Sequence, residues 1–165
     1  MTSIVEHQVK LNLSQEKAWQ IMQDLTQPHR YVPGLIDCKM HEGNTQGVGA
    51  SRRVFKKMMQ LDETVTEWKE GEGFTLKLHF ESKDKPLPNA FFRYELKPIN
   101  DQQCFFIATM GYDFWLGKIG QVINQLLVLP FVKKEIRDVA YALKHFYEFS
   151  ETPTAADIKR LRYLS

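Results

Sequence analysis

The sequence lacks most of the motifs that mark a catalytic or cofactor-binding site. No G-x-S-x-G motif for a nucleophilic serine occurs. The run Gly47-Val48-Gly49 does not continue to the dinucleotide motif G-x-G-x-x-G, because Arg52 occupies the last position and a strand follows. No two histidines, and no group of cysteine and histidine, stand at metal-ligand spacing. We therefore expect no metal site and no cofactor.

Cysteines and long apolar runs are also scarce. The two cysteines, Cys38 and Cys104, lie on separate predicted strands, which favours buried free thiols over a disulfide. The most apolar run, Val122 to Val132, contains Pro130 and polar residues and falls short of the roughly 20 residues that a membrane span needs. No apolar signal segment follows Met1. These absences predict a cytoplasmic protein without stable membrane insertion.

Neither sign of charge dominates the chain. The net charge is +2 and the positive residues are dispersed, which argues against nucleic acid as a partner. The length of 165 residues, with 43% apolar and 25% charged residues, is typical of one globular domain with its own core.

The first third of the chain predicts two strands separated by short helices. Residues Ile4 to Leu13 alternate between apolar and polar, as in a half-buried strand that turns His7 inward. Ser14 is a good N-cap for a helix over Gln15 to Leu25, and a short helical turn follows at His29 to Val32. A second strand is predicted over Leu35 to Glu42, with its apolar face formed by Ile36, Cys38 and Met40.

Three hairpin-linked strands are predicted over 48–57, 60–70 and from Gly73 to about Phe80. A two-residue loop at Met58-Met59 would place Arg52 opposite Val65. A loop at Gly71-Glu72 would place Glu63 opposite Phe80. Both loops give the same inner face, which consists of Val48, Ala50, Arg52, Val54, Leu61, Glu63, Val65, Glu67, Leu76, Leu78 and Phe80.

Two further strands, about 90–97 and 103–113, have two possible registers. A two-residue loop between them would pair Tyr94 with Ile107, whereas a three-residue loop would turn Phe106, Ala108 and Met110 inward. In either register Phe92 and Tyr94 share one face of the first of these strands. The sequence leaves both registers open.

The end of the chain predicts one long helix over Gly117 to Glu148, because apolar residues recur at steps of three and four. Pro130 should kink or break it, since proline cannot donate to the carbonyl four residues earlier. The part from Phe131 onward should pack on the sheet. The part from Trp115 to Leu129 is interpreted as a lid over a cavity. Residues 149–165 are expected to form a frayed or loosely docked tail.

This order of elements predicts an α+β domain: a curved antiparallel sheet of about seven strands around a long C-terminal helix, with two short helices after the first strand. Several stretches resemble the SRPBCC superfamily of START, polyketide cyclase and Bet v 1-like proteins, which has this helix-grip fold. The resemblance covers about residues 3–148, so the domain is placed at 1–148. It is most similar to the bacterial polyketide cyclase/dehydrase and lipid-transport-like branch. The stretches are Ala18-Trp19-Gln20-Ile21-Met22-Gln23-Asp24, Tyr31-Val32-Pro33, Gly47-Val48-Gly49-Ala50-Ser51-Arg52, Glu63-Thr64-Val65-Thr66-Glu67-Trp68 and Ala142-Leu143-Lys144-His145-Phe146-Tyr147-Glu148.

The resemblance implies a cavity between sheet and helix for a hydrophobic molecule such as a lipid, sterol, polyketide or quinone. Arg52 and Glu63 are predicted neighbours on its inner wall, either as an internal ion pair or as a polar anchor for a ligand. Tyr94 could donate a hydrogen bond to the ligand, Glu67 should lie near the rim, and His7 is interpreted as a core residue. The predicted apolar contacts are Val65, Leu78, Phe80, Phe92 and Leu126.

The sequence thus favours a binding or carrier protein for a small hydrophobic molecule over an enzyme. The alternative is an aromatase/cyclase-like enzyme in which Glu63 and Tyr94 act as acid or base in the same cavity. A second alternative is a protein-interaction module that binds a partner through the C-terminal tail, which contains the basic segment Lys159-Arg160-Leu161-Arg162.

Overall fold

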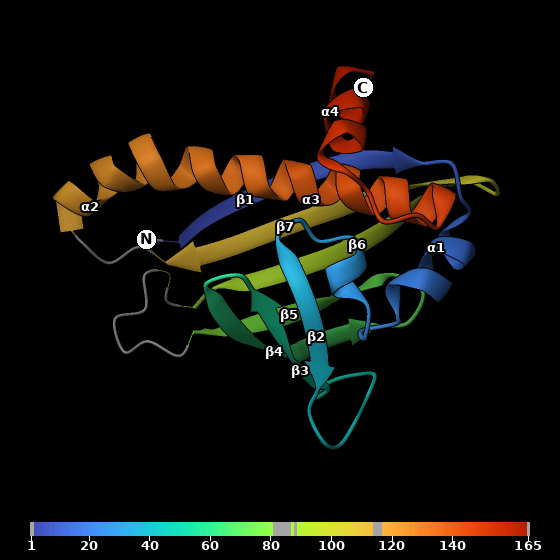
Figure 1. Cartoon of the computed structure of the whole chain (residues 1–165), viewed down its shortest axis with the longest axis horizontal. Helices are drawn as coiled ribbons and strands as arrows, with labels where there is room; N and C mark the ends of the chain where they lie inside the picture. The colour runs from blue at the N-terminus through green and yellow to red at the C-terminus, as the bar shows by residue number, and fades with distance from the viewer. Residues whose placement is uncertain (1, 81–86, 88, 114–116, 165) are drawn as a thin grey trace.

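The computed structural model describes residues 2–80, 87, 89–113 and 117–164, and its core is one curved antiparallel sheet (Figure 1). Seven strands lie in the order β1-β7-β6-β5-β4-β3-β2. Their bounds are β1 Thr2–Leu11, β2 Leu35–Met40, β3 Ser51–Lys56, β4 Met59–Lys69, β5 Gly73–Phe80, β6 Phe91–Asn100 and β7 Gln103–Asp113.

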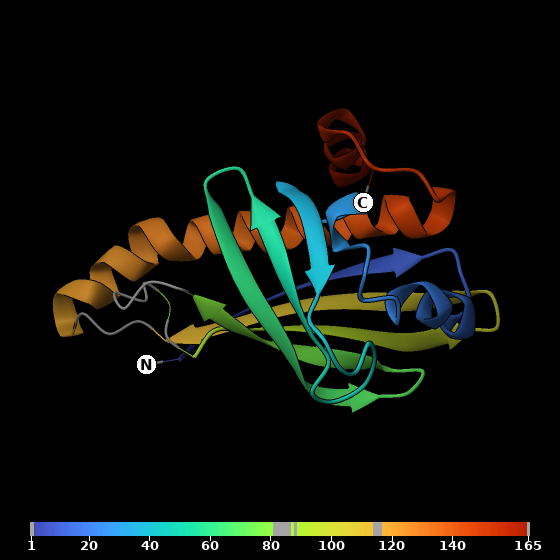
Figure 2. The same cartoon turned by 60° about the horizontal axis from the view of Figure 1, so that its bottom comes forward.

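The helical segments lie on the concave side of this sheet and at its ends. Figure 2 shows the sheet bent around α3, with β3 and β4 rising on one side of the helix and β1, β7 and β6 running beneath it. The α+β helix-grip prediction is therefore confirmed. The helical bounds are α1 Gln15–Met22, the 3-10 helix η1 Pro28–Arg30, α2 Gly117–Ile123, the π-helical turn η2 Asn124–Val128, α3 Leu129–Phe149 and α4 Ala155–Tyr163.

The hairpin registers of β3, β4 and β5 differ from the prediction by two residues. Lys56 pairs with Met59, so the first loop consists of Lys57 and Met58, and Arg52 lies directly opposite Glu63. In the next hairpin Glu63 pairs with Leu78 instead of Phe80. A shift of two residues leaves every side chain on its predicted face, because side chains alternate with a period of two.

Two register shifts within strands do change the face of a predicted inner residue. The ladder between β4 and β5 shifts between Val65 and Glu67, which turns Glu67 to the outer face. There Glu67 accepts a 2.7 Å hydrogen bond from Thr75, so its predicted position on the inner face is wrong. A similar shift between Leu35 and Asp37 leaves Ile36 exposed.

The predicted third strand also begins too early. β3 starts at Ser51, and Val48 lies before it in the preceding loop with 60% of its surface exposed. Ala50 keeps its predicted position and is fully buried. Gly47 and Gly49 both have positive φ angles, which an extended strand does not allow and which explain the late start.

The register of β6 and β7 resolves the alternatives that the sequence left open. Tyr94 pairs with Ala108 and Phe92 with Met110, so the register that turns Phe106, Ala108 and Met110 inward is the observed one. The chain reaches this register through a shift between Pro98 and Asn100 followed by a two-residue turn, because Asn100 pairs with Gln103.

The long C-terminal helix is continuous but distorted just before Pro130. In the turn η2 the Leu129 N–H donates to the carbonyl of Asn124, five residues earlier, as in a π-helix. Pro130 follows directly inside the continuous helix and has no N–H to donate to the carbonyl of Leu126, which explains why the distortion lies at this point. The distortion predicted at Pro130 thus takes the form of a π-helical turn. The stripe of α3 that faces the sheet contains Val132, Ile136, Val139, Ala140, Leu143, Phe146 and Tyr147.

Of the two predicted forms of the tail, frayed or loosely docked, the structure shows a docked helix that has no buried residue. Thr154 and Asp157 form a capping box at the start of α4. Arg162 donates to Asp138 of α3 over 3.1 Å, and Ile158 and Leu161 pack against the core. Figure 1 shows α4 standing to one side of α3.

Candidate ligand-binding pocket

A cavity of about 220 Å³ lies between the inner face of the sheet and α3. Its floor comes from β3, β4, β5, β6 and β7, and its roof from the first three turns of α3. Most of its lining is apolar. The residues of the predicted site that line it are Arg52, Glu63, Leu78, Phe80, Phe92 and Tyr94.

Two predicted ligand contacts lie elsewhere. Val65 is on the expected face, but it is 1% exposed and belongs to the packed core beyond the cavity. Leu126 is 69% exposed, because the π-helical turn rotates it away from the sheet. Neither residue lines the cavity.

Arg52 and Glu63 form a buried ion pair in the cavity wall. The Arg52 Nε donates to Glu63 Oε2 over 2.7 Å, and the two residues are 3% and 7% exposed. The Arg52 Nη1 donates to the backbone carbonyl of Leu25 over 2.7 Å, which fixes the guanidinium. Burial alone would lower the pKa of Arg52, but the negative charge of Glu63 outweighs it and the net pKa is raised. The guanidinium therefore stays charged inside an apolar cavity.

Tyr94 presents a neutral phenol to the same cavity. Its ring packs between Phe74 and Phe106, at centroid distances of 5.4 and 5.7 Å. Burial raises the pKa of Tyr94, so its hydroxyl stays protonated at neutral pH. No other described residue makes a hydrogen bond with this hydroxyl. Tyr94 is thus available as a donor or acceptor for a ligand.

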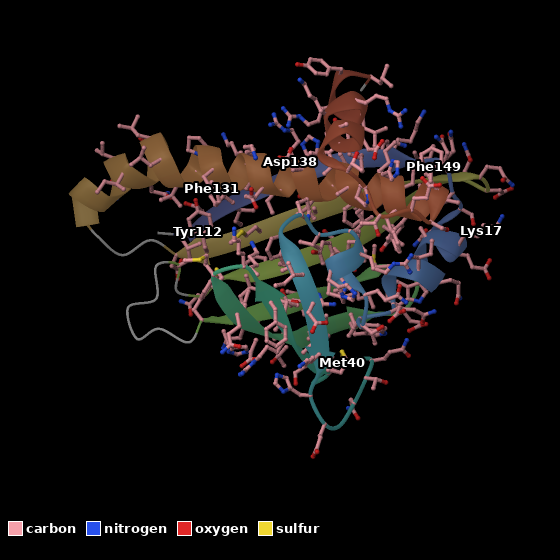
Figure 3. The ribbon with its side chains drawn as sticks, viewed as in Figure 1. Lys17, Met40, Tyr112, Phe131, Asp138 and Phe149 are labelled. Atoms are coloured by element: carbon pink, nitrogen blue, oxygen red, sulfur yellow. The ribbon has the colours of Figure 1, made fainter. Side chains whose placement is uncertain are left out.

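The mouth of the cavity is marked by the lining residues that are exposed. These are Lys56 and Met59 on the β3–β4 hairpin and Phe131 on α3. Figure 3 shows Phe131 at the same end of the molecule as Tyr112, whereas Phe149 lies at the opposite end. The cavity therefore opens toward the end of the helix that carries α2.

Several lining residues were not predicted from the sequence. Pro28 and Val32 come from the connection around η1, where no pattern indicated their direction. Val132 and Val139 belong to the buried stripe of α3, so their spacing could have identified them. Met110 depended on the register that the sequence left open.

The other titratable candidates stay outside the cavity. His7 packs against the ring of Tyr141 at 5.4 Å, but it is only partly buried and its Nε2 makes no hydrogen bond, so it lies at the edge of the core and not in it. Burial and then the charge of Arg137 lower the pKa of His7. Both cysteines are free thiols; Cys104 is buried as expected, and Cys38 is only half-buried. Among the described residues, no three His, Cys, Asp or Glu side chains converge as a metal site.

The chain was compared with known protein families and sequences. A family model described as "Polyketide cyclase / dehydrase and lipid transport" matches residues 2–148. The comparison with curated protein sequences finds no match. Within the described ranges, no helix is long and apolar enough to cross a membrane.

Solved structures with the same fold share little sequence with this chain. An uncharacterised protein from Bacillus thuringiensis is 16% identical with a TM-score of 0.68, over 88% of this chain and 98% of that one. A protein from Nitrosospira multiformis is 14% identical with a TM-score of 0.65, over 90% and 98%. Norcoclaurine synthase from Thalictrum flavum, in complex with dopamine and hydroxybenzaldehyde, is 13% identical with a TM-score of 0.60, over 88% and 86%. At these identities the likeness shows the fold alone.

Proposed function

We propose that this protein, which belongs to the polyketide cyclase / dehydrase and lipid transport family of the SRPBCC superfamily, binds a small hydrophobic molecule in the cavity between its sheet and α3. The observation that carries this proposal is a charged pair set into an otherwise apolar cavity. A packed core of the same size would be stable without Arg52 and Glu63, because burying charges costs free energy that the pair only partly recovers. A ligand with a polar end would form hydrogen bonds with these charged groups.

The lining specifies the kind of ligand. Leu78, Phe80 and Phe92 would contact an apolar body. Arg52 has five N–H donors, of which Glu63 and the Leu25 carbonyl use two, so donors remain for a carbonyl or carboxylate oxygen. The cavity is smaller than the roughly 300–1,000 Å³ of pockets for drug-sized ligands. A compact molecule, or one end of a longer molecule whose remainder lies in the mouth, fits this volume.

Native mass spectrometry of the protein purified from cells tests the proposal directly. The protein should carry an adduct of small-lipid size that denaturation releases. Leu78→Trp fills the cavity and should remove the adduct, whereas Ile99→Trp adds the same side chain at a 40% exposed position and should keep it. A protein that carries no adduct and takes up no fatty acid, polyketide or quinone from solution would contradict the proposal.

A cyclase- or dehydratase-like reaction is the second candidate. The observation that favours it is that Glu63 and Tyr94, both able to exchange a proton, line one cavity. Glu63→Gln keeps the shape of the side chain and removes its charge. Under the enzymatic alternative it should abolish turnover while ligand uptake continues, and equal loss of both would favour a structural role for the ion pair.

A further inference from the structure

An exposed apolar patch covers the helix before, within and just after the π-helical turn. Val122 is 55% exposed, Leu126 69%, Leu127 68% and Phe131 61%, and Ile123 adjoins them. No charged residue occurs between Ile119 and Val132. Exposed apolar residues that adjoin one another usually mark a binding surface, whereas single ones need no explanation. We call these five residues the helix patch.

Apart from Phe131, the residues of the helix patch do not line the cavity. Asn124 is buried, accepts a 3.0 Å hydrogen bond from the Tyr112 hydroxyl and donates to the Ser3 hydroxyl over 2.9 Å. These bonds hold η2 against β1 and β7 with Asn124 inward, so Leu126 and Leu127 point to solvent. In both views the α2 end of the helix extends past the end of the sheet (Figures 1 and 2). Val128 of the same segment does line the cavity. The lid over Trp115 to Leu129 stays a prediction, and Trp115 lies outside the described residues.

Positive charge follows the helix patch along the same helix. Lys133 and Lys134 are exposed and Arg137 is partly exposed. Glu135 lines the cavity, but its side chain is also 33% exposed and lies 3.9 Å from Lys134. Asp138 pairs with Lys134 over 3.1 Å and with Arg137 over 3.8 Å. The three positive residues therefore exceed these two acidic ones by a single charge. An apolar stretch that continues into lysine and arginine is typical of a helix that lies in the interface of an anionic membrane.

The helix patch is also continuous with the mouth of the cavity. Phe131 belongs to both, and Val128 connects them within η2. On the opposite rim, Met58 is 91% exposed at the tip of the β3–β4 hairpin, beside Lys56 and Lys57. Apolar side chains next to lysines thus occur on both rims.

We propose that the helix patch docks this protein onto the surface of a membrane that contains anionic phospholipid. The apolar side chains would enter the boundary between headgroups and acyl chains, and Lys133, Lys134 and Arg137 would face the phosphates. The mouth would then open at the bilayer, where a hydrophobic ligand is most concentrated. Docking itself does not depend on the proposed ligand, whereas exchange of a ligand with the membrane rests on the proposed function.

Flotation of the full chain with lipid vesicles tests the docking. Vesicles of about one-third phosphatidylglycerol in phosphatidylcholine should carry the protein, and pure phosphatidylcholine should carry far less. Val122→Gln with Leu127→Gln should weaken binding by about tenfold or more. The matched control is Val48→Gln with Leu164→Gln, which changes the same residue types at 60% and 77% exposed positions outside the patch and should bind like the wild type.

Separate variants test the contribution of the lysines that follow the helix patch. Lys133→Gln and Lys134→Gln should each weaken binding to the anionic vesicles by about fivefold and reduce its salt sensitivity. The control is Lys77→Gln with Lys97→Gln, at exposed positions on β5 and β6, which should change neither the binding nor its salt sensitivity. Circular dichroism of every variant checks that it is folded.

Three outcomes would overturn the proposal. The first is that the wild type does not bind anionic vesicles, and the second is that all variants bind them as well as the wild type. The third is that the wild type self-associates, that Val122→Gln with Leu127→Gln converts it to a monomer, and that vesicles bind neither protein. The last would assign the helix patch to a second copy of the chain. Leu78→Trp separates the two proposals, because it should abolish ligand uptake and leave vesicle binding unchanged. Failure of ligand uptake and failure of vesicle binding can therefore be distinguished from each other.

Discussion

Breaking the Arg52–Glu63 ion pair should destabilise the fold far more than breaking the ion pair beside it. Arg52→Met leaves the Glu63 carboxylate without its 2.7 Å partner in an apolar wall and removes the hydrogen bond to the Leu25 carbonyl. Removing one member of a buried ion pair costs about 3–5 kcal/mol. Glu63 lines the cavity and keeps 7% of its surface accessible, so we expect a loss of about 3 kcal/mol in the free energy of unfolding, the lower end of that range.

The neighbouring pair provides a matched control on the same two strands. Arg53 Nε and Nη2 each donate to Asp62 over 2.7 Å, but both side chains are about a third exposed on the outer face. An exposed pair contributes about 1 kcal/mol or less. Arg53→Met should therefore cost clearly less than Arg52→Met, although its distances are the same.

Urea unfolding at pH 7, followed by tryptophan fluorescence, measures both effects. The double variant Arg52→Met with Glu63→Leu removes the charges together and should recover most of the lost stability, because an apolar pair of similar volume needs no compensation. If Arg52→Met costs less than about 1 kcal/mol, or if the double variant costs the sum of the single ones, Arg52 and Glu63 are not a desolvated pair. The proposed polar anchor would then lose its basis.

Three smaller effects follow from single contacts. Hydrogen bonding to Arg53 lowers the pKa of Asp62 to about 2. The contribution of the Asp62 carboxylate to the free energy of unfolding should therefore be complete above about pH 4 and disappear as the pH falls toward 2. In urea unfolding, Asp62→Asn should cost about 1 kcal/mol at pH 7, after allowance for the exposure of the side chain, and little near pH 2. Tyr94→Phe should leave the unfolding free energy within about 0.5 kcal/mol and weaken ligand binding up to about tenfold by calorimetry; an unchanged affinity would remove Tyr94 from the site. Thr154→Ala deletes the cap that Asp157 completes and should cost α4 about 1 kcal/mol, seen as faster hydrogen exchange in 155–163 alone.

The alternation of side chains along each strand made part of the site predictable, and an error of two residues in strand pairing did not change which face a side chain occupies. The loop between β3 and β4 was misplaced by one position, which moved Arg52 from opposite Val65 to opposite Glu63. Both side chains stayed on the inner face, because the error in pairing was even. The ion pair and Tyr94 were therefore recognisable from sequence before their contacts were known.

Single extra residues within β2 and β4 account for the side chains that were predicted on the wrong face of the sheet. An extra residue in one strand reverses the face of everything beyond it, so Glu67 moved to the outer face and Ile36 became exposed. Nothing in the local residue types distinguishes Thr66 as the position of such a shift. After the shift Trp68 packs against Phe74 across the hairpin and against Trp19 of α1, which is far away in sequence.

The π-helical turn is the helical counterpart of these shifts, and it has the larger consequence for function. The three- and four-residue spacing of apolar residues predicts one long helix in which Leu126 contacts the ligand. A π-helical turn adds one residue to a turn, so the residues before it rotate relative to those after it. Asn124 takes the buried position, where its amide satisfies Tyr112 and Ser3, and the apolar side chains around it face solvent. Exposing such side chains costs free energy, which a partner surface would recover; a lipid interface beside the cavity mouth is the partner that the flanking lysines favour.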